Sequence, residues 1–176
     1  TQSITPTAGT AATIAINGGN NQSATVSTVV ATAPSVLVTD GAGNAVSGVS
    51  VTFAVATGSG SVTGSAAITN SSGIATVGSW TLGPTAGTNN NTITATSAGL
   101  TNSPLTFTAS ATTGGANRRV LTTQAAGAAS GAAFTTQPVV QIQDAAGNLV
   151  DDDATVVTMT VGGGATTAGT VTATAS

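Results

Sequence analysis

Apolar and polar residues alternate with a period of two along much of the chain. In residues 49–55 the odd positions are apolar, and Ser50, Thr52 and Ala54 fall between them. The same alternation of apolar residues with threonine returns around Ile93 and around Phe107. A period of two places alternate side chains on opposite faces of a strand, so these segments predict half-buried strands with threonine toward water. No stretch has the spacing of an amphipathic helix.

Short turn signals rich in Gly, Asn and Asp separate these segments, for example at residues 17–19, 40–44, 72–73 and 113–115. Such residues form turns because they accept positive φ or bond nearby backbone N–H groups. Roughly seven or eight short strands fit into about a hundred residues, and loops too short for helical crossovers favour antiparallel pairing. The sequence therefore predicts an all-β chain built from antiparallel β-sandwiches.

One long motif occurs twice. PSVLVTDGAGNAVSG begins at Pro34, and PVVQIQDAAGNLVDD begins at Pro138, 104 residues later, with the same spacing from Pro to Asp and from Asp to Asn. Self-similarity at a fixed offset predicts tandem copies of one module. We expect an N-terminal extension over residues 1–9, a β-sandwich over 10–112, a linker over 113–117 and a second sandwich over 118–176.

The second sandwich is predicted to be incomplete within this chain, because the offset places Ser176 opposite Ser72. Two explanations stay open: the chain is a piece of a longer array, or strands from another polypeptide complete the fold, as in strand donation. The extension is a candidate donor strand, with Ile4 as its one anchoring apolar residue. Alternatively, the extension is the end of a preceding repeat.

Charged side chains are nearly absent. The chain has two arginines, at the adjacent positions 118 and 119, five aspartates, and no Lys, Glu, His or Cys. Two adjacent cations cannot follow a phosphate backbone, so we expect no nucleic acid partner. No apolar run approaches the length of a membrane span, so we expect no membrane insertion. Acid–base catalysis would lack its usual side chains, so we expect no enzyme activity and no cofactor.

The composition of the surface suggests self-association. Soluble monomers usually keep charged surfaces that resist association, whereas only 4% of these residues are charged. A surface of Thr, Ser, Asn, Ala and Gly packs against a copy of itself with little desolvation of charge. We therefore expect a homopolymer, outside the cell or on its surface. The first ten residues have neither a basic region nor an apolar stretch, so we expect any secretion signal to be removed or to lie elsewhere.

One acidic cluster is a candidate ion site. Asp151, Asp152 and Asp153 lie near Asp144 and Asn148 across a predicted turn. Carboxylate and amide oxygens are the ligands that Ca²⁺ prefers, so a calcium site is one hypothesis. Against it, neighbouring side chains on a strand point to opposite faces, and acidic runs at strand ends are commonly solvated. Both interpretations stay open.

Two further candidates have structural explanations. Asp40 and Asn44 occupy the matching positions of the first repeat, where Asp-x-x-Gly-Asn is favourable for a turn. Trp80 is the only tryptophan, and carbohydrate sites generally present more than one aromatic ring, so we predict that it lies in the core.

The segments Asp40–Phe53 and Gly73–Thr88 carry the patterns D-x-x-G-N-x-V-x-G-V-x-V-x-F and G-x-W-T-L-G-x-x-A-G. In these the chain resembles bacterial Ig-like domains of the invasin and intimin type. The resemblance implies tandem Ig-like sandwiches, a secreted or cell-surface location, and a role as a stalk, spacer or adhesive module without enzyme activity. We expect either a self-assembling filament or surface-layer subunit or an adhesin stalk. A module that binds a carbohydrate or host receptor is the competing class.

Overall fold

The computed structural model describes residues 7–129, 131–151, 156–158 and 172–174. Every regular element among them is a β-strand, which confirms the prediction of an all-β chain. The chain divides into two compact units, Thr1–Thr112 and Thr113–Ser176, which are described separately below. The described residues contain no helix long and apolar enough to cross a membrane.

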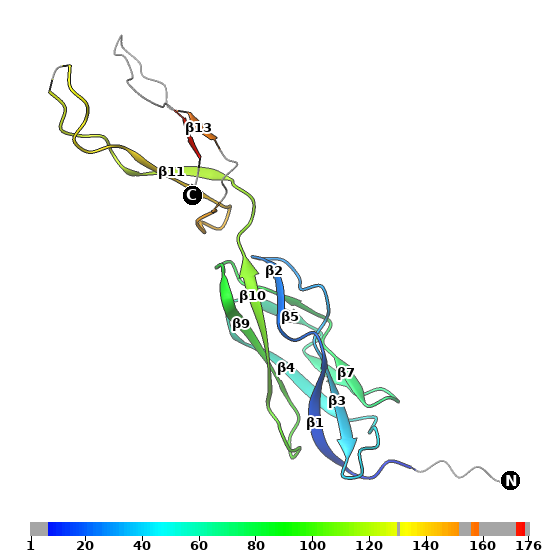
Figure 1. Cartoon of the computed structure of the whole chain (residues 1–176). Coiled ribbons are helices and arrows are strands. Elements are labelled where there is room, and N and C mark those ends of the chain that lie inside the picture. The colour runs from blue at the N-terminus through cyan, green and yellow to red at the C-terminus, as the bar shows by residue number, and fades with distance from the viewer. Residues whose placement is uncertain (1–6, 130, 152–155, 159–171, 175–176) are drawn as a thin grey trace. The chain divides into compact units, whose positions relative to one another are not determined.

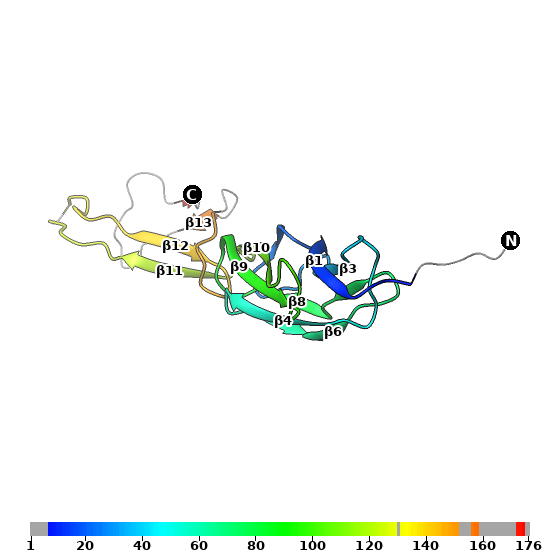
Figure 2. The same ribbon diagram turned by 90° about the horizontal axis from the view of Figure 1, so that it is seen from below.

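Unit 1 is a sandwich of two main sheets. One sheet has three strands in the order β1 (Ala11–Gly18), β3 (Ser35–Asp40) and β7 (Ile74–Thr76). The other has five, in the order β2 (Gln22–Thr25), β10 (Leu105–Thr112), β9 (Gly87–Thr96), β4 (Ser50–Thr57) and β6 (Ala66–Ile68). The short strands β5 (Ser61–Thr63) and β8 (Ser79–Thr81) pair with each other. Figure 2 shows β1 and β3 in one layer and β4, β6 and β9 in the other.

The core of unit 1 follows the predicted alternation. In β4, Val51 and Phe53 are buried while Thr52 between them is exposed. In β9 and β10, Ile93 and Phe107 are buried, and the threonines beside them are half-buried or exposed. The rings of Phe53 and Phe107 pack with their centroids 6.4 Å apart. Trp80 is fully buried among these residues, so its predicted place in the core is confirmed.

Most strand pairs are antiparallel, as expected for strands joined by short loops. The exception is β2, which runs parallel to the end of β10, with Gln22 opposite Ala109 and Thr25 opposite Thr112. These two strands lie far apart in the sequence, so no short loop constrains their direction. The segment after β1 leaves the three-stranded sheet and continues as β2 on the edge of the other sheet.

Unit 2 contains two separate pairs of strands among the described residues. β11 (Arg118–Thr123) is antiparallel to β12 (Val139–Gln143), and β13 (Val156–Thr158) is antiparallel to β14 (Thr172–Thr174). The register of the first pair repeats that of β1 and β3: Arg119 lies opposite Ile142, as Ile14 lies opposite Val38. The second copy of the repeated motif therefore builds the same two-stranded ribbon as the first.

Candidate ion-binding and assembly sites

The two Asp-x-x-Gly-Asn motifs form turns of the same construction. In unit 1, Asp40 Oδ1 accepts hydrogen bonds from the backbone N–H groups of Ala42 and Asn44, both at 2.9 Å. The Asn44 side-chain amide donates to the same carboxylate, at 3.0 Å from Oδ2. The backbone closes the turn, because the Asp40 N–H donates to the Asn44 carbonyl at 2.9 Å. The turn predicted from the sequence is thus present.

The second turn repeats these bonds at the positions offset by 104. Asp144 Oδ1 accepts from the Asn148 N–H at 2.8 Å, and Asp144 Oδ2 accepts from the Asn148 side-chain amide at 2.8 Å. The Asp144 N–H donates to the Asn148 carbonyl at 3.0 Å. Asp144 is 1% exposed and Asp40 is 6% exposed, so both carboxylates are buried yet well supplied with donors.

In each turn the carboxylate also binds the backbone of a distant glycine. Asp40 Oδ2 accepts from the Gly9 N–H at 2.7 Å, and Asp144 Oδ2 accepts from the Gly114 N–H at 3.0 Å. Gly9 lies just before β1, and Gly114 lies shortly before β11. This role of the two aspartates was not predicted from the sequence. A signal was present, because each motif aspartate follows such a glycine by 31 and 30 residues respectively.

These hydrogen bonds favour the ionised carboxylates. The Asn44 side chain, and next the Gly9 N–H, hold the pKa of Asp40 well below its usual range. Burial by itself would raise the pKa of Asp144, but the bonds from Asn148 and Gly114 outweigh it and lower the pKa to about 2. Both aspartates are therefore fully charged at neutral pH and act as hydrogen-bond acceptors.

The candidate calcium ligands are not gathered into one site among the described residues. Asp144 and Asn148 bond to each other in the turn, and Asp151 is exposed. Asp152 and Asp153 lie outside the described residues. The described part of the chain holds no group of three or more acidic, His or Cys side chains that could hold a metal ion. The calcium site stays a prediction, which calorimetric titration with Ca²⁺ would test.

The candidate donor residue Ile4 also lies outside the described residues, so strand donation stays a prediction. On the acceptor side, unit 2 carries apolar side chains that are about half exposed: Leu121, Phe134, Val139 and Leu149. Among the described strands β12 pairs with β11 alone, whereas its counterpart β3 pairs with both β1 and β7. Part of the second edge of β12 is covered, because the Val150 N–H donates to the Ile142 carbonyl at 2.9 Å and Leu149 bridges Gln143. The start of β12, where no other described strand pairs with that edge, is a surface on which another strand can add.

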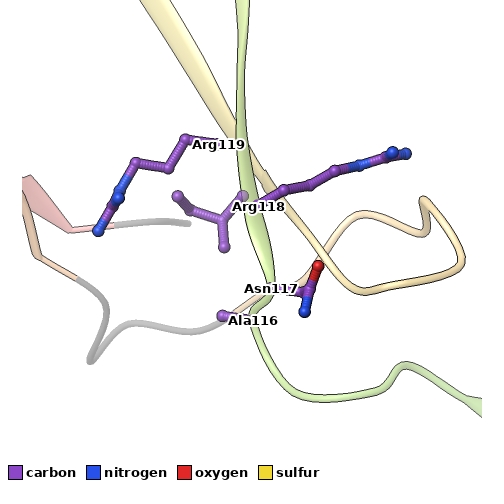
Figure 3. A pocket seen from close by; sticks show the side chains of 5 residues that line it. Ala116, Asn117, Arg118 and Arg119 are labelled. Atoms are coloured by element: carbon purple, nitrogen blue, oxygen red, sulfur yellow. The ribbon is translucent and has the colours of Figure 1, made fainter.

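A shallow hollow of about 90 Å³ lies beside β11, lined by Ala116, Asn117, Arg118, Arg119 and Ile142. Figure 3 shows the two arginines extending to opposite sides of the strand. The Arg118 Nε donates to Gln143 Oε1 at 3.0 Å. Pockets for small organic ligands generally measure about 300 Å³ or more, so this hollow is too small for such a ligand.

Comparison with known proteins gives structural similarity only. No protein-family model matches the chain, and no curated protein matches it. Domains 4–9 of the surface layer protein SbsC match over 88% of this chain, with 20% sequence identity and a TM-score of 0.42. FdeC, an adhesin of Escherichia coli, matches over 76% with 17% identity and a TM-score of 0.43. The chain spans 24% of the SbsC structure and 40% of the FdeC structure. Both similarities are distant, and both are to bacterial surface proteins.

Proposed function

We propose that this chain is a structural part of a bacterial extracellular or cell-surface protein, in which Ig-like modules follow one another and copies assemble into a filament or surface layer. The proposal begins from the sequence patterns of Asp40–Phe53 and Gly73–Thr88, which resemble bacterial Ig-like domains. It has no enzymatic component. Three observations support it: the path of the chain through unit 1, the threonine-rich face of the five-stranded sheet, and the half-exposed apolar side chains of unit 2.

The path of the chain through unit 1 carries the proposal. The chain arrives at the end of the sandwich where Ala11 pairs with Asp40. It leaves from β10 at Thr112, beside Thr25. Figure 1 shows these two places at opposite ends of unit 1. A module that the chain crosses from one end to the other can be joined in series with further modules without any rearrangement of its strands.

The surface of the five-stranded sheet suits contact between copies. Threonine side chains form rows across its strands. Thr108 lies opposite Thr92, and Thr106 lies opposite Thr94. Thr52 lies opposite Thr96 in the next strand pair. Covering such a face displaces water from hydroxyl groups, which can bond again across an interface, and removes no ion from water. We infer that this face tolerates close packing against a second copy.

Strand donation is the finer part of the proposal. The apolar ribbon of β11 and β12 would accept a strand from another copy, and the segment around Ile4 would supply it. The half-exposed Leu121 and Val139 support this, because covering them removes apolar surface from water at about 25 cal/mol per Å². The proposal therefore makes a separate prediction for Ile4.

Electron microscopy and sedimentation of the full chain test both parts. We expect filaments or layers from the unmodified chain, and loss of assembly with Ile4→Ser but not with the neighbouring control Thr5→Ser. Assembly that persists in Ile4→Ser would overturn strand donation, whereas the proposal that copies assemble into a polymer would still stand. A chain that remains monomeric at all concentrations would overturn the polymer and favour a stalk or spacer segment of an adhesin.

A further inference from the structure

Hydrogen bonds fix the backbone on both sides of Thr113. On one side, the Val26 N–H donates to the carbonyl of Thr112, the last residue of β10, at 2.9 Å. On the other side, the Gly114 N–H donates to Asp144 Oδ2 at 3.0 Å. The first bond lies within unit 1 and the second within unit 2. Thr113 is therefore the one residue between two anchored positions.

The anchor on the second side recurs at the start of unit 1. There the Gly9 N–H donates to Asp40 Oδ2, with the same Asp-x-x-Gly-Asn turn behind the carboxylate. In both turns Oδ1 accepts the backbone N–H of the motif asparagine, while Oδ2 accepts the glycine N–H. Oδ2 also accepts the side-chain amide of the motif asparagine, so it serves both the turn and the incoming chain. A contact that only completed the turn would need no distant glycine.

The two glycines differ in the space beside the carboxylate. A Cβ atom on Gly9 would lie 3.3 Å from Asp40 Oδ2, so the neighbouring atoms would have to shift by a few tenths of an ångström. A Cβ on Gly114 would lie 3.4 Å from the Cβ of Asp144, an ordinary van der Waals contact. A Cβ on Gly41, in the turn of Asp40, would meet nothing within 4 Å. Gly9 and Gly41 are therefore a matched pair of substitution sites in unit 1.

We propose that each motif aspartate is a junction latch, which holds the glycine where the chain enters a module and so limits the flexible connection between modules. The inference rests on the proposed function as an array of modules. Each residue of a free linker contributes two soft backbone dihedrals. The predicted linker of residues 113–117 would contribute ten, whereas the latch at Gly114 leaves Thr113 as the one residue between the anchored positions Thr112 and Gly114. Asn117 is held as well, because its N–H donates to the Gln143 carbonyl at 2.9 Å.

The latch is tested on the full chain by NMR. Asp144→Asn keeps the oxygen that accepts the Asn148 N–H and replaces the other oxygen with an NH₂ group, which can accept neither the Gly114 N–H nor the Asn148 side-chain amide. We expect the Gly114 amide to exchange about tenfold faster or more, the factor for losing a hydrogen bond to a charged acceptor. We also expect ¹⁵N relaxation to show faster local motion at residues 113–115. Asp40→Asn should leave both readouts unchanged and speed exchange at Gly9 instead.

Gly9→Ala with Gly41→Ala as its control gives a second test if Asp144→Asn does not fold. We expect Gly9→Ala to speed exchange of its own amide and to increase motion at Ala8, and Gly41→Ala to leave both unchanged. Unchanged exchange at residue 114 in Asp144→Asn would overturn the latch, and so would faster exchange without any gain in motion at Thr113. These measurements use single chains, so a failure of the polymer proposal would appear in sedimentation and leave the latch result unaffected.

Discussion

The ribbon of β1 and β3 in unit 1 and the ribbon of β11 and β12 in unit 2 share a register, a turn and a buried aspartate, but they differ in what covers them. In unit 1 the inward residues Ile14 and Val38 are both fully buried. At the matching positions of unit 2, Ile142 is 3% exposed but Arg119 is an exposed cation. The turn forms from local bonds in both units, and the aspartate of each turn also binds a distant glycine. Among the described residues, the matching positions are all apolar and buried only in unit 1.

Exchanging Ile14 and Arg119, the residues at matching positions of the two ribbons, should give the largest difference in unfolding free energy between the units. Ile14→Arg would bury an unpaired charge in unit 1, and we expect a loss of more than about 4 kcal/mol of unfolding free energy. Arg119→Ile changes an exposed side chain, and we expect a change within about 0.5 kcal/mol. Urea unfolding followed by Trp80 fluorescence reports on unit 1, and amide exchange in β12 reports on unit 2. Equal effects at the two positions would contradict the difference in burial.

A single type of truncation in both units should give the next largest contrast. Phe107 is fully buried and packs beside Phe53, so Phe107→Ala should cost about 3–5 kcal/mol. Phe134 is 48% exposed in unit 2, and Phe134→Ala should cost about 0.5 kcal/mol or less. Calorimetric scans of the full chain measure both. A large loss from Phe134→Ala would show that this ring is covered in solution.

Acid should weaken both turns, and here the units should behave alike. The folded-state pKa of each aspartate lies below its ordinary value of 3.8. The stability that these carboxylates contribute is therefore complete above about pH 4 and is lost as the pH falls toward 2 for Asp144, and lower still for Asp40. Thermal unfolding across this range should show a fall that Asp40→Asn reduces in unit 1 and Asp144→Asn reduces in unit 2. A fall that is unchanged in both variants would assign the acid sensitivity to other groups.

The smallest expected effect concerns the glycine inside each turn. Gly43 has φ of +88° and Gly147 has φ of +94°, a conformation that costs other residues about 1–2 kcal/mol. Gly43→Ala should therefore destabilise unit 1 by about that amount. Gly41→Ala in the same turn is the control, because its added Cβ meets nothing within 4 Å and its φ is not positive. The midpoints of urea unfolding measure this difference. Equal midpoints for Gly43→Ala and Gly41→Ala would contradict the requirement for glycine at position 43.

The sequence predicted the strands of unit 1 well because period-two alternation reports burial on one face directly. Phe53 and Phe107 are buried where that pattern places them. The same pattern could not reveal the parallel pairing of β2 with β10, which joins residues 87 positions apart such as Gln22 and Ala109. Pairings of that kind depend on the whole sandwich, and no local spacing encodes them.

The candidate site was predictable only in part, for a related reason. The Asp-x-x-Gly-Asn turn is local, and both copies were recognised from the sequence. The bonds from Asp40 to Gly9 and from Asp144 to Gly114 are long-range, and only the repeated spacing of glycine and aspartate hinted at them. Arg119 shows where local pattern fails. Its register places it at the position of the buried Ile14, yet its side chain is exposed. Burial at that position depends on the residues that pack over the strand, and the alternation of apolar residues does not reveal them.

The path of the chain through unit 1 also determines how the module would respond to a pulling force. An array stretched along its length would pull β1 at Gly9 and β10 at Thr112, from opposite ends of the sandwich. Antiparallel hydrogen bonds lie perpendicular to their strands, so sliding β1 past β3 would load the whole ladder of bonds at once. The Gly9–Asp40 bond stands first in that ladder and would share the load. Unit 1 would therefore resist tension in shear if it were stretched from the start of β1 and the end of β10.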